Sequence, residues 1–164
     1  MKRVVTVLGV LIIMGSSAAS EFSTAIYHGN GRFYPSDPKS KSAGYAIDIS
    51  VTRTSATSTD VTERLSGPKL PGVSDTHYAV TQRAGSSVYY DIQSEGSAIG
   101  WGYCFGITGG KKCHYEMDLD GVRHEIFFTV INGAIYRTSS FEDSKGGVTV
   151  TRESLSLDAP TPLE

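Results

Sequence analysis

The chain has 164 residues, with 15 Lys and Arg against 17 Asp and Glu, which gives a net charge of −2 at pH 7. This length fits a single domain that is large enough to bury a core. The slightly acidic balance argues against nucleic acid or an anionic membrane surface as the main partner, because both attract basic proteins.

The first twenty residues have the pattern of a secretory signal peptide. Lys2 and Arg3 supply positive charge, residues 4–14 form an apolar run, and residues 15–20 are small. We predict that residues 1–20 are removed on export, to the periplasm or outside the cell. An uncleaved N-terminal anchor is the alternative, but the apolar run is shorter than the roughly 20 residues that span a bilayer. Without this segment 13 basic residues remain against 17 acidic ones, a net charge of −4, and no remaining segment is predicted to span a membrane.

The rest of the chain is rich in Gly, Ser and Thr and shows no helical periodicity. Short segments of alternating character recur about every ten residues, which is typical of antiparallel β-proteins. The predicted strands are residues 22–32, 45–54, 60–65, 77–83, 87–93, 97–105, 112–119, 122–131, 134–141 and 148–157. We therefore predict an all-β domain over residues 21–158, a single antiparallel meander barrel of about eight to ten strands. A β-sandwich is the alternative, and residues 159–164 are predicted to be a flexible tail.

Three local features refine this pattern. Asp60 and Glu63 have the spacing of a helix capping box, so a short helix is the alternative to a strand there. Residues 34–43 and 66–76 contain two prolines each and are predicted to be surface loops that frame the barrel mouth. The apolar residues of the last strand change parity, which predicts a β-bulge near residues 152–154.

The two cysteines, Cys104 and Cys113, are expected to form a disulfide, because an exported protein meets an oxidising compartment. A metal site would need partners at ligand spacing, and the sequence has no CxxC pair. Asp120-Gly121 and Asn132-Gly133 lie between β-prone runs and predict two-residue hairpin turns. If the disulfide places Cys104 directly opposite Cys113 in the hairpin before these turns, the disulfide and the two turns together determine the pairing of residues 97–141.

This register sorts the three hairpins into two faces, because successive strand residues point to opposite sides. One face is mostly apolar and is interpreted as packing; it carries Cys104, Cys113, Tyr115, Met117, Leu119, Val122, Ile126, Phe128 and Val130. His124 lies among them and is interpreted as a satisfied histidine near a strand end. The other face mixes aromatic and charged groups and is the predicted ligand-binding site: Trp101, Tyr103, His114, Glu116, Arg123, Glu125, Phe127 and Tyr136. The pattern does not decide which face is interior.

The second face offers two kinds of chemistry. His114, Glu116 and Asp118 on one side of a strand, with Glu125 opposite, could hold a divalent cation. A solvated polar face balanced by Arg123 explains the same residues, so we predict no metal and no cofactor. Glu116 and Glu125 could also act as a carboxylate pair in glycoside hydrolysis, which would require a deep cleft. The sequence shows no serine or cysteine nucleophile pattern, and the predicted function is non-catalytic.

The layout of an exported chain of meander strands with a late disulfide hairpin resembles the lipocalin-like (calycin) β-barrel proteins. Lipocalins carry Gly-x-Trp in the first strand. Here that region reads Gly29-Asn30-Gly31-Arg32-Phe33-Tyr34, and the single Trp101 is mid-chain. The resemblance covers most of the mature chain as a pattern and transfers no site residue. It implies a closed barrel whose interior holds a small apolar ligand.

Two functions fit these observations. The first is a carrier of a small apolar or amphipathic ligand, with a cavity lined by Trp101, Tyr103, Phe127 and Tyr136. The alternative is a secreted or periplasmic protein-interaction module, such as an inhibitor or surface factor, that binds a protein through the two proline-containing loops. A hydrolase ranks third. A connected interior cavity above roughly 300 Å³ would favour the carrier.

Overall fold

The computed structural model describes residues 24–37, 39–67, 75–142 and 146–158. The predicted signal peptide and the predicted C-terminal tail lie outside these ranges. Every regular element within them is a β-strand. The same residues include no helix with the length and apolar character needed to cross a bilayer.

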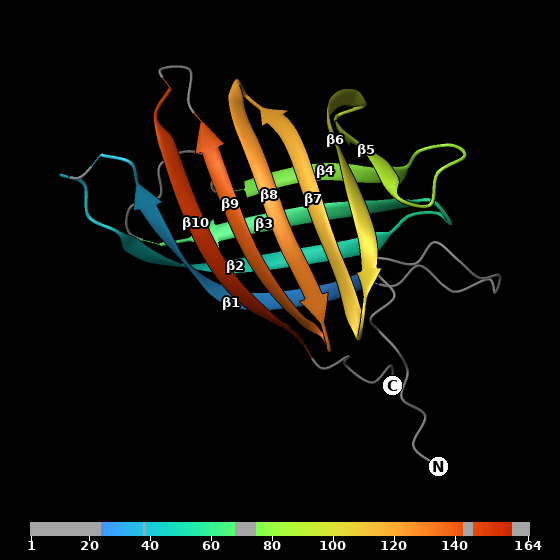
Figure 1. Ribbon diagram of the computed structural model, residues 1–164, viewed down its shortest axis with the longest axis horizontal. Helices are drawn as coiled ribbons and strands as arrows, with labels where there is room; N and C mark the ends of the chain where they lie inside the picture. Colours follow the sequence, from blue (N-terminus) through green and yellow to red (C-terminus); the bar gives the residue numbers. More distant parts are fainter. Residues whose placement is uncertain (1–23, 38, 68–74, 143–145, 159–164) are drawn as a thin grey trace, which may run out of the picture.

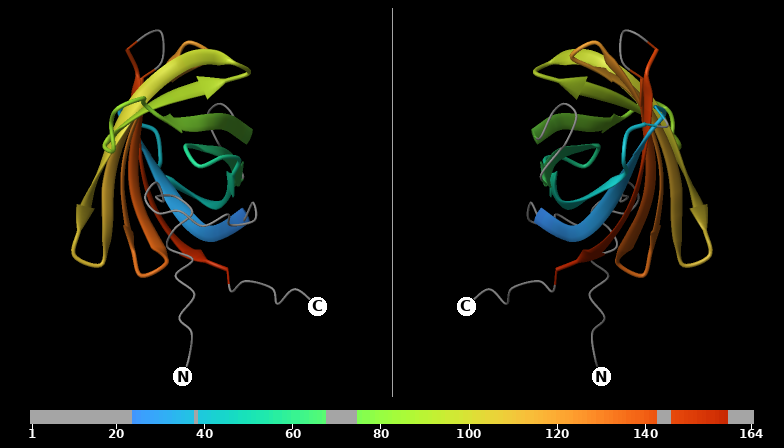
Figure 2. Two further views of the ribbon diagram at one scale, coloured as in Figure 1. Left: turned by 90° about the vertical axis from the view of Figure 1, so that its right-hand side faces the viewer. Right: turned by 90° about the vertical axis from the view of Figure 1, so that its left-hand side faces the viewer.

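Ten strands form a closed antiparallel barrel in which sequence neighbours pair and β1 also pairs with β10 (Figure 1). The strands are β1 Thr24–Pro35, β2 Ala43–Arg53, β3 Ser58–Ser66, β4 Asp75–Gln82, β5 Tyr89–Ser94, β6 Ser97–Ile107, β7 Gly110–Leu119, β8 Val122–Ile131, β9 Ala134–Glu142 and β10 Val148–Leu157. In Figure 1, β6–β10 form the near wall and β1–β4 cross behind them; Figure 2 shows the two walls enclosing one interior. The predicted meander barrel is confirmed, and the sandwich alternative is wrong.

The predicted strand at 60–65 is confirmed, and the helix alternative is wrong. Asp60 and Glu63 both lie in β3. The two predicted proline-containing loops fall between β1 and β2 and between β3 and β4, although β1 extends to Pro35; residue 38 and residues 68–74 of these loops lie outside the described residues. Because the chain runs up and down around the barrel, both connections lie at the same end, together with the β7–β8 and β9–β10 connections.

The last strand corrects one prediction. β10 pairs without interruption with both β1 and β9, so the predicted bulge near residues 152–154 is wrong. Thr151 and Glu153 are buried in the interior, whereas Val148 is exposed. Polar residues therefore occupy the interior positions, which is why the apolar residues suggested a change of parity. A register shift occurs instead between β5 and β6, where Ile92 pairs with Gly100 and the next residue, Gln93, pairs with Ala98.

The hairpin registers predicted from the turn residues are confirmed. Asp120 and Gly121 both have positive φ, 55° and 76°, as a type I′ turn requires. Cys104 pairs directly with Cys113, and the two form a disulfide. The ring of Tyr115 packs so closely over a glycine of β6 that a Cβ at this position would lie 2.1 Å from the ring. That glycine is Gly102, and its missing side chain makes room for the tyrosine.

The core fills the barrel interior. Its fully buried side chains include Tyr27, Ile47, Val51, Ile92 and Val130, which come from both walls. The packing face predicted for the hairpins points into this core, since Tyr115, Met117, Ile126 and Phe128 are also buried. The interior is therefore mostly filled, and open space remains toward the end that carries the β1–β2 and β3–β4 connections.

Candidate functional site

A cavity of about 260 Å³ lies inside the barrel at this end. Its apolar walls come from residues near the strand ends: Phe33, Leu65, Met117, Leu119, Val122 and Phe141. Its inner part is polar, with Tyr45, Glu63, Tyr78, Arg137, Ser139 and Thr151. His124 also lines the cavity and lies nearer the mouth, level with its cross-strand partners Met117 and Phe141. An apolar mouth above a polar floor suits a ligand with one apolar end and one polar end.

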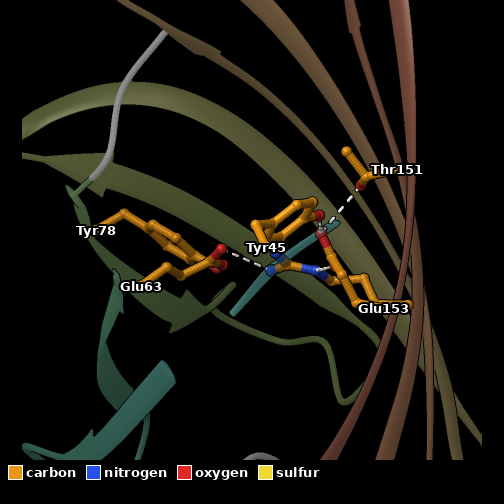
Figure 3. Close-up of polar contacts among 6 residues, drawn as sticks. Tyr45, Glu63, Tyr78, Thr151 and Glu153 are labelled. Atoms are coloured by element: carbon orange, nitrogen blue, oxygen red, sulfur yellow. Dashed lines mark hydrogen bonds and ion pairs between the residues drawn. The ribbon is translucent and has the colours of Figure 1, made fainter. Parts of the chain in front are cut away.

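The floor is built on a buried guanidinium between two buried carboxylates (Figure 3). Arg137 of β9 places Nη1 at 2.7 Å from Oε2 of Glu63 in β3, and its Nε donates to Oε2 of Glu153 in β10. All three residues are less than 8% exposed. Burial lowers the pKa of Arg137, but the attraction of the two carboxylates outweighs it, so the pKa lies well above its usual value. The guanidinium is charged at every accessible pH.

Three hydroxyl groups complete the network. The Tyr78 hydroxyl donates to Oε1 of Glu63 at 2.7 Å, and the Thr151 hydroxyl donates to Oε1 of Glu153 at 3.0 Å. The Tyr45 hydroxyl also donates to Oε1 of Glu153. Burial, together with the nearby carboxylates, raises the pKa of both tyrosines. Both phenols therefore stay protonated as donors, and a fully bonded polar network of this kind holds its members rigidly.

Two further polar groups lie beside this network and are not part of it. The buried hydroxyl of Ser139 has no hydrogen-bond partner among the described residues. His124 also faces the cavity, with its ring edge-on to Phe141 at 4.6 Å. Burial lowers the pKa of His124, so the imidazole is neutral at pH 7. Each group can offer a hydrogen bond to a molecule in the cavity.

The structure brings the predicted ligand-binding residues together on one face, but this face lies outside the barrel. Trp101 is 39% exposed, Phe127 48% and Tyr136 56%. The expectation that these residues line the interior cavity is therefore wrong, and their role in ligand binding stays a prediction. Alternation in a strand defines two faces and does not say which one is concave, and here the disulfide face is the interior one.

On this outer face, His114 is held between aromatic rings and carboxylates. Its ring stacks on Phe127 at 4.3 Å with 9° between the planes. Its Nε2 lies 3.1 Å from Oε1 of Glu125 and 3.8 Å from Oε1 of Glu116. Arg123 Nη2 approaches the other oxygen of Glu116 at 3.4 Å. The two glutamates lie on the outer wall and not in the deep cleft that glycoside hydrolysis requires.

A second histidine cluster, on β1, was not predicted. His28 Nδ1 lies 2.5 Å from Oδ1 of Asp48, and Nε2 lies 2.8 Å from Oδ2 of Asp158. The hydrogen bond to Asp48 raises the pKa of His28, with a further contribution from Asp158. The three residues come from β1, from β2 and from beyond β10, so local sequence patterns gave no sign of the contact.

Sequence reasoning also missed the cavity floor. Glu63 shares its strand parity with buried Val61, and Arg137 shares its parity with buried Ile135. A charged residue in phase with the apolar residues of a strand is the signal that would have identified both. Glu153 of β10 has the same property relative to Leu155.

The fold and the site define a closed β-barrel with a polar-floored interior cavity. The chain matches no protein-family model and no curated protein. Among solved structures it is similar to the S-type phycobiliprotein lyase CPES from Guillardia theta, with a TM-score of 0.58 and 12% sequence identity, over 83% of this chain and 88% of that chain. At this identity the likeness is one of fold alone, and the resemblance to calycins remains a resemblance.

Proposed function

We propose that this chain is an exported, non-catalytic protein that binds a compact amphipathic molecule inside its barrel. The observation that carries the proposal is the cavity itself, with apolar walls at the mouth and an unpartnered Ser139 hydroxyl in its polar floor. The apolar part of the ligand packs against the mouth, and its polar end bonds to Ser139 and His124.

The cavity volume limits the size of the ligand. About 260 Å³ corresponds to roughly nine water molecules at about 30 Å³ each. This volume is below the roughly 300 Å³ that would favour a carrier of a drug-sized ligand. The ligand is therefore small, or part of it extends through the mouth into solvent.

The charges of the floor limit its chemistry. One guanidinium and two carboxylates, from Arg137, Glu63 and Glu153, carry a net charge of −1, and all of them are already bonded to one another. Since the neighbouring imidazole of His124 is neutral at pH 7, the floor repels an anion. A hydroxyl, amide or amine group on the ligand suits this site better than a carboxylate or phosphate.

Two further observations support the proposal. The disulfide between Cys104 and Cys113 fits an oxidising compartment, in agreement with a periplasmic or secreted location. A phycobiliprotein lyase has a similar barrel, which is consistent with a role in handling another molecule. We transfer neither the lyase activity nor the phycobiliprotein to this chain.

The test is native mass spectrometry of the protein purified from its own host, before and after denaturation. A small molecule that is retained by the native protein and released on unfolding supports the proposal. Val122→Trp should block the mouth and abolish retention, because Val122 lines the cavity, whereas Val148→Trp on the outer surface should not. Equal retention by both variants would place the ligand elsewhere.

Ser139→Ala probes the polar floor separately. Removing a buried hydroxyl that has no protein partner should leave the free protein as stable or up to about 1 kcal/mol more stable. The same change should weaken ligand binding about fivefold or more, since one hydrogen bond contributes about 1 kcal/mol. Unchanged affinity would show that the ligand does not reach the floor.

The alternative function is a protein-interaction module. That it would bind a protein through the two proline-containing loops stays a prediction. An exposed aromatic patch beside these loops would favour it. Most exposed aromatic side chains lie instead on the β5–β9 wall, including Tyr89, Trp101, Phe105, Phe127 and Tyr136. The cavity therefore supports the carrier better than the surface supports this module.

A further inference from the structure

We propose that His114, Glu116 and Glu125 form a binding site for a divalent transition-metal ion of the zinc class on the outer wall of the barrel. The site is separate from the cavity, because these side chains point away from the interior. One imidazole nitrogen and two carboxylates are the donor types that zinc takes in proteins, and a three-residue set leaves a position for water or another ligand.

The distances suit a single ion. His114 Nε2 lies 3.1 Å from Glu125 Oε1 and 3.8 Å from Glu116 Oε1, and the potential ligand atoms of the three residues all lie within 4.8 Å of one another. With bonds of about 2.1 Å, two ligand atoms of a tetrahedral zinc ion lie about 3.4 Å apart. The observed separations bracket this value, so small side-chain rotations complete the coordination.

The second histidine cluster shows why convergence matters. At His28 the two carboxylates bond to opposite nitrogens of the ring, Asp48 to Nδ1 and Asp158 to Nε2. The two carboxylates therefore cannot coordinate one ion together with a single nitrogen of His28. At His114 both glutamates approach Nε2, whose single hydrogen can satisfy only one of them. A cation in the place of that hydrogen satisfies all three ligands.

The charges around the cluster favour a cation. Glu116 and Glu125 are direct cross-strand partners of β7 and β8, and like charges in this position repel. Arg123 contacts Glu116 at 3.4 Å, with a side chain that is 64% exposed, so water screens this contact strongly. Asp118, the fourth ligand suggested by the sequence, accepts a hydrogen bond from the Gly121 amide and belongs to the turn. The site thus has two carboxylates with little compensation.

The aromatic side chains hold the histidine in place. His114 is buried, stacked on Phe127, and edge-on to Tyr103 at 5.3 Å and to Trp101 at 6.3 Å. A ligand whose ring is already fixed loses little conformational freedom when the metal binds. The glutamate side chains are 28% and 39% exposed, so an ion reaches them from solvent.

The single tryptophan makes the proposal directly testable. Trp101 lies beside His114, and Co²⁺, a paramagnetic substitute for zinc, quenches indole fluorescence at short range. Titration of the metal-free mature protein with Co²⁺ should quench Trp101 saturably at one ion per chain, with visible absorption of four- or five-coordinate cobalt. Zn²⁺ should reverse both signals, and Mg²⁺ should not.

Variants assign the ligands. Glu125→Gln and Glu116→Gln should each weaken Co²⁺ binding at least tenfold, because even partners of a metal's ligands contribute 10–100-fold to affinity. His28→Gln should bind as the wild type does, and so should Val122→Trp, which closes the cavity. No saturable quenching at millimolar Co²⁺, or equal affinity in the glutamate variants, would overturn the proposal. Glutamine has nearly the shape of glutamate, and positions 116 and 125 are partly exposed, so both variants are expected to fold. Circular dichroism verifies this.

Discussion

Replacing Arg137 by methionine tests the network that forms the cavity floor. The guanidinium bonds to the buried carboxylates of Glu63 and Glu153. Methionine keeps much of the side-chain volume but leaves both carboxylates in the interior without their cation. Removing one partner of a buried ion pair costs about 3–5 kcal/mol. Because two carboxylates lose their partner, we expect the upper part of this range, about 4–5 kcal/mol at pH 7.

This loss should shrink as the pH falls. Burial raises the pKa of Glu153, but the charge and hydrogen bond of Arg137, with the hydroxyls of Tyr45 and Thr151, outweigh it and hold the pKa below its usual value of 4.5. A lowered carboxyl pKa contributes stability above the unfolded-state pKa, and this is lost as the pH falls through the folded-state pKa. In the variant burial acts without the cation, so protonation of Glu153 relieves the penalty. The difference between the two proteins is therefore largest near neutral pH, and it is smallest below the lowered folded-state pKa of Glu153.

The assay is urea unfolding followed by far-UV circular dichroism at neutral and acidic pH. Arg152→Met is the matched control, because Arg152 is exposed on β10 and lies 5.8 Å from the centre of the Tyr34 ring. It should change the unfolding free energy by no more than about 1 kcal/mol. The reasoning is refuted if Arg137→Met is as mild as this control at pH 7, or if its effect does not depend on pH.

Three further predictions concern the wall of the barrel. Because the pKa of His28 is raised in the folded state, the protonated histidine stabilises the protein fully below pH 6.5, and this stabilisation is lost as the pH rises through the folded-state pKa. The melting temperature of the wild type should therefore exceed that of His28→Gln at acidic pH and approach it at alkaline pH. Replacing both Cys104 and Cys113 by alanine opens a loop with a sequence separation of 9 and should cost about 2.6 kcal/mol in urea unfolding. Gly102→Ala, which forces a methyl group against the tyrosine ring, should cost about 1–3 kcal/mol. Gly106→Ala in the same strand has open space around it and should be neutral or stabilising by up to about 1 kcal/mol; equal effects of the two would contradict the packing.

The sequence predicted the pairing of the hairpins to the residue. Turn dipeptides such as Asp120-Gly121 fix the loop length, and a fixed loop length fixes which residues face each other. Glu116 accordingly pairs with Glu125, and Cys104 with Cys113. The first pairing follows from turn geometry and the second from the expected disulfide, so neither depends on how the sheet curves.

The direction of curvature was the part that local patterns could not supply. Both faces of β7 and β8 carry large apolar side chains, Tyr115 and Phe128 on one and Phe127 on the other. Only closure of all ten strands decides which face is concave. The cavity floor has the same origin: Arg137, Glu63 and Glu153 come from three strands, and the contact between Arg137 and Glu63 crosses the interior between β9 and β3, which are not neighbours. Pairing rules for adjacent strands cannot predict this contact.

The two proposed sites use opposite sides of the same two strands. Met117 of β7 and His124 of β8 face the cavity, while Glu116 and Glu125, one residue away in each strand, face outward. Adjacent residues of a strand point in opposite directions, so a ligand inside and an ion outside share a backbone without sharing a side chain. The buried network then serves the interior site alone. Its members bond to one another and keep a net charge of −1, so Ser139 and His124 are the groups that remain to bond to the ligand. Loss of metal binding should therefore leave the cavity intact, and blocking the cavity should leave the metal site intact.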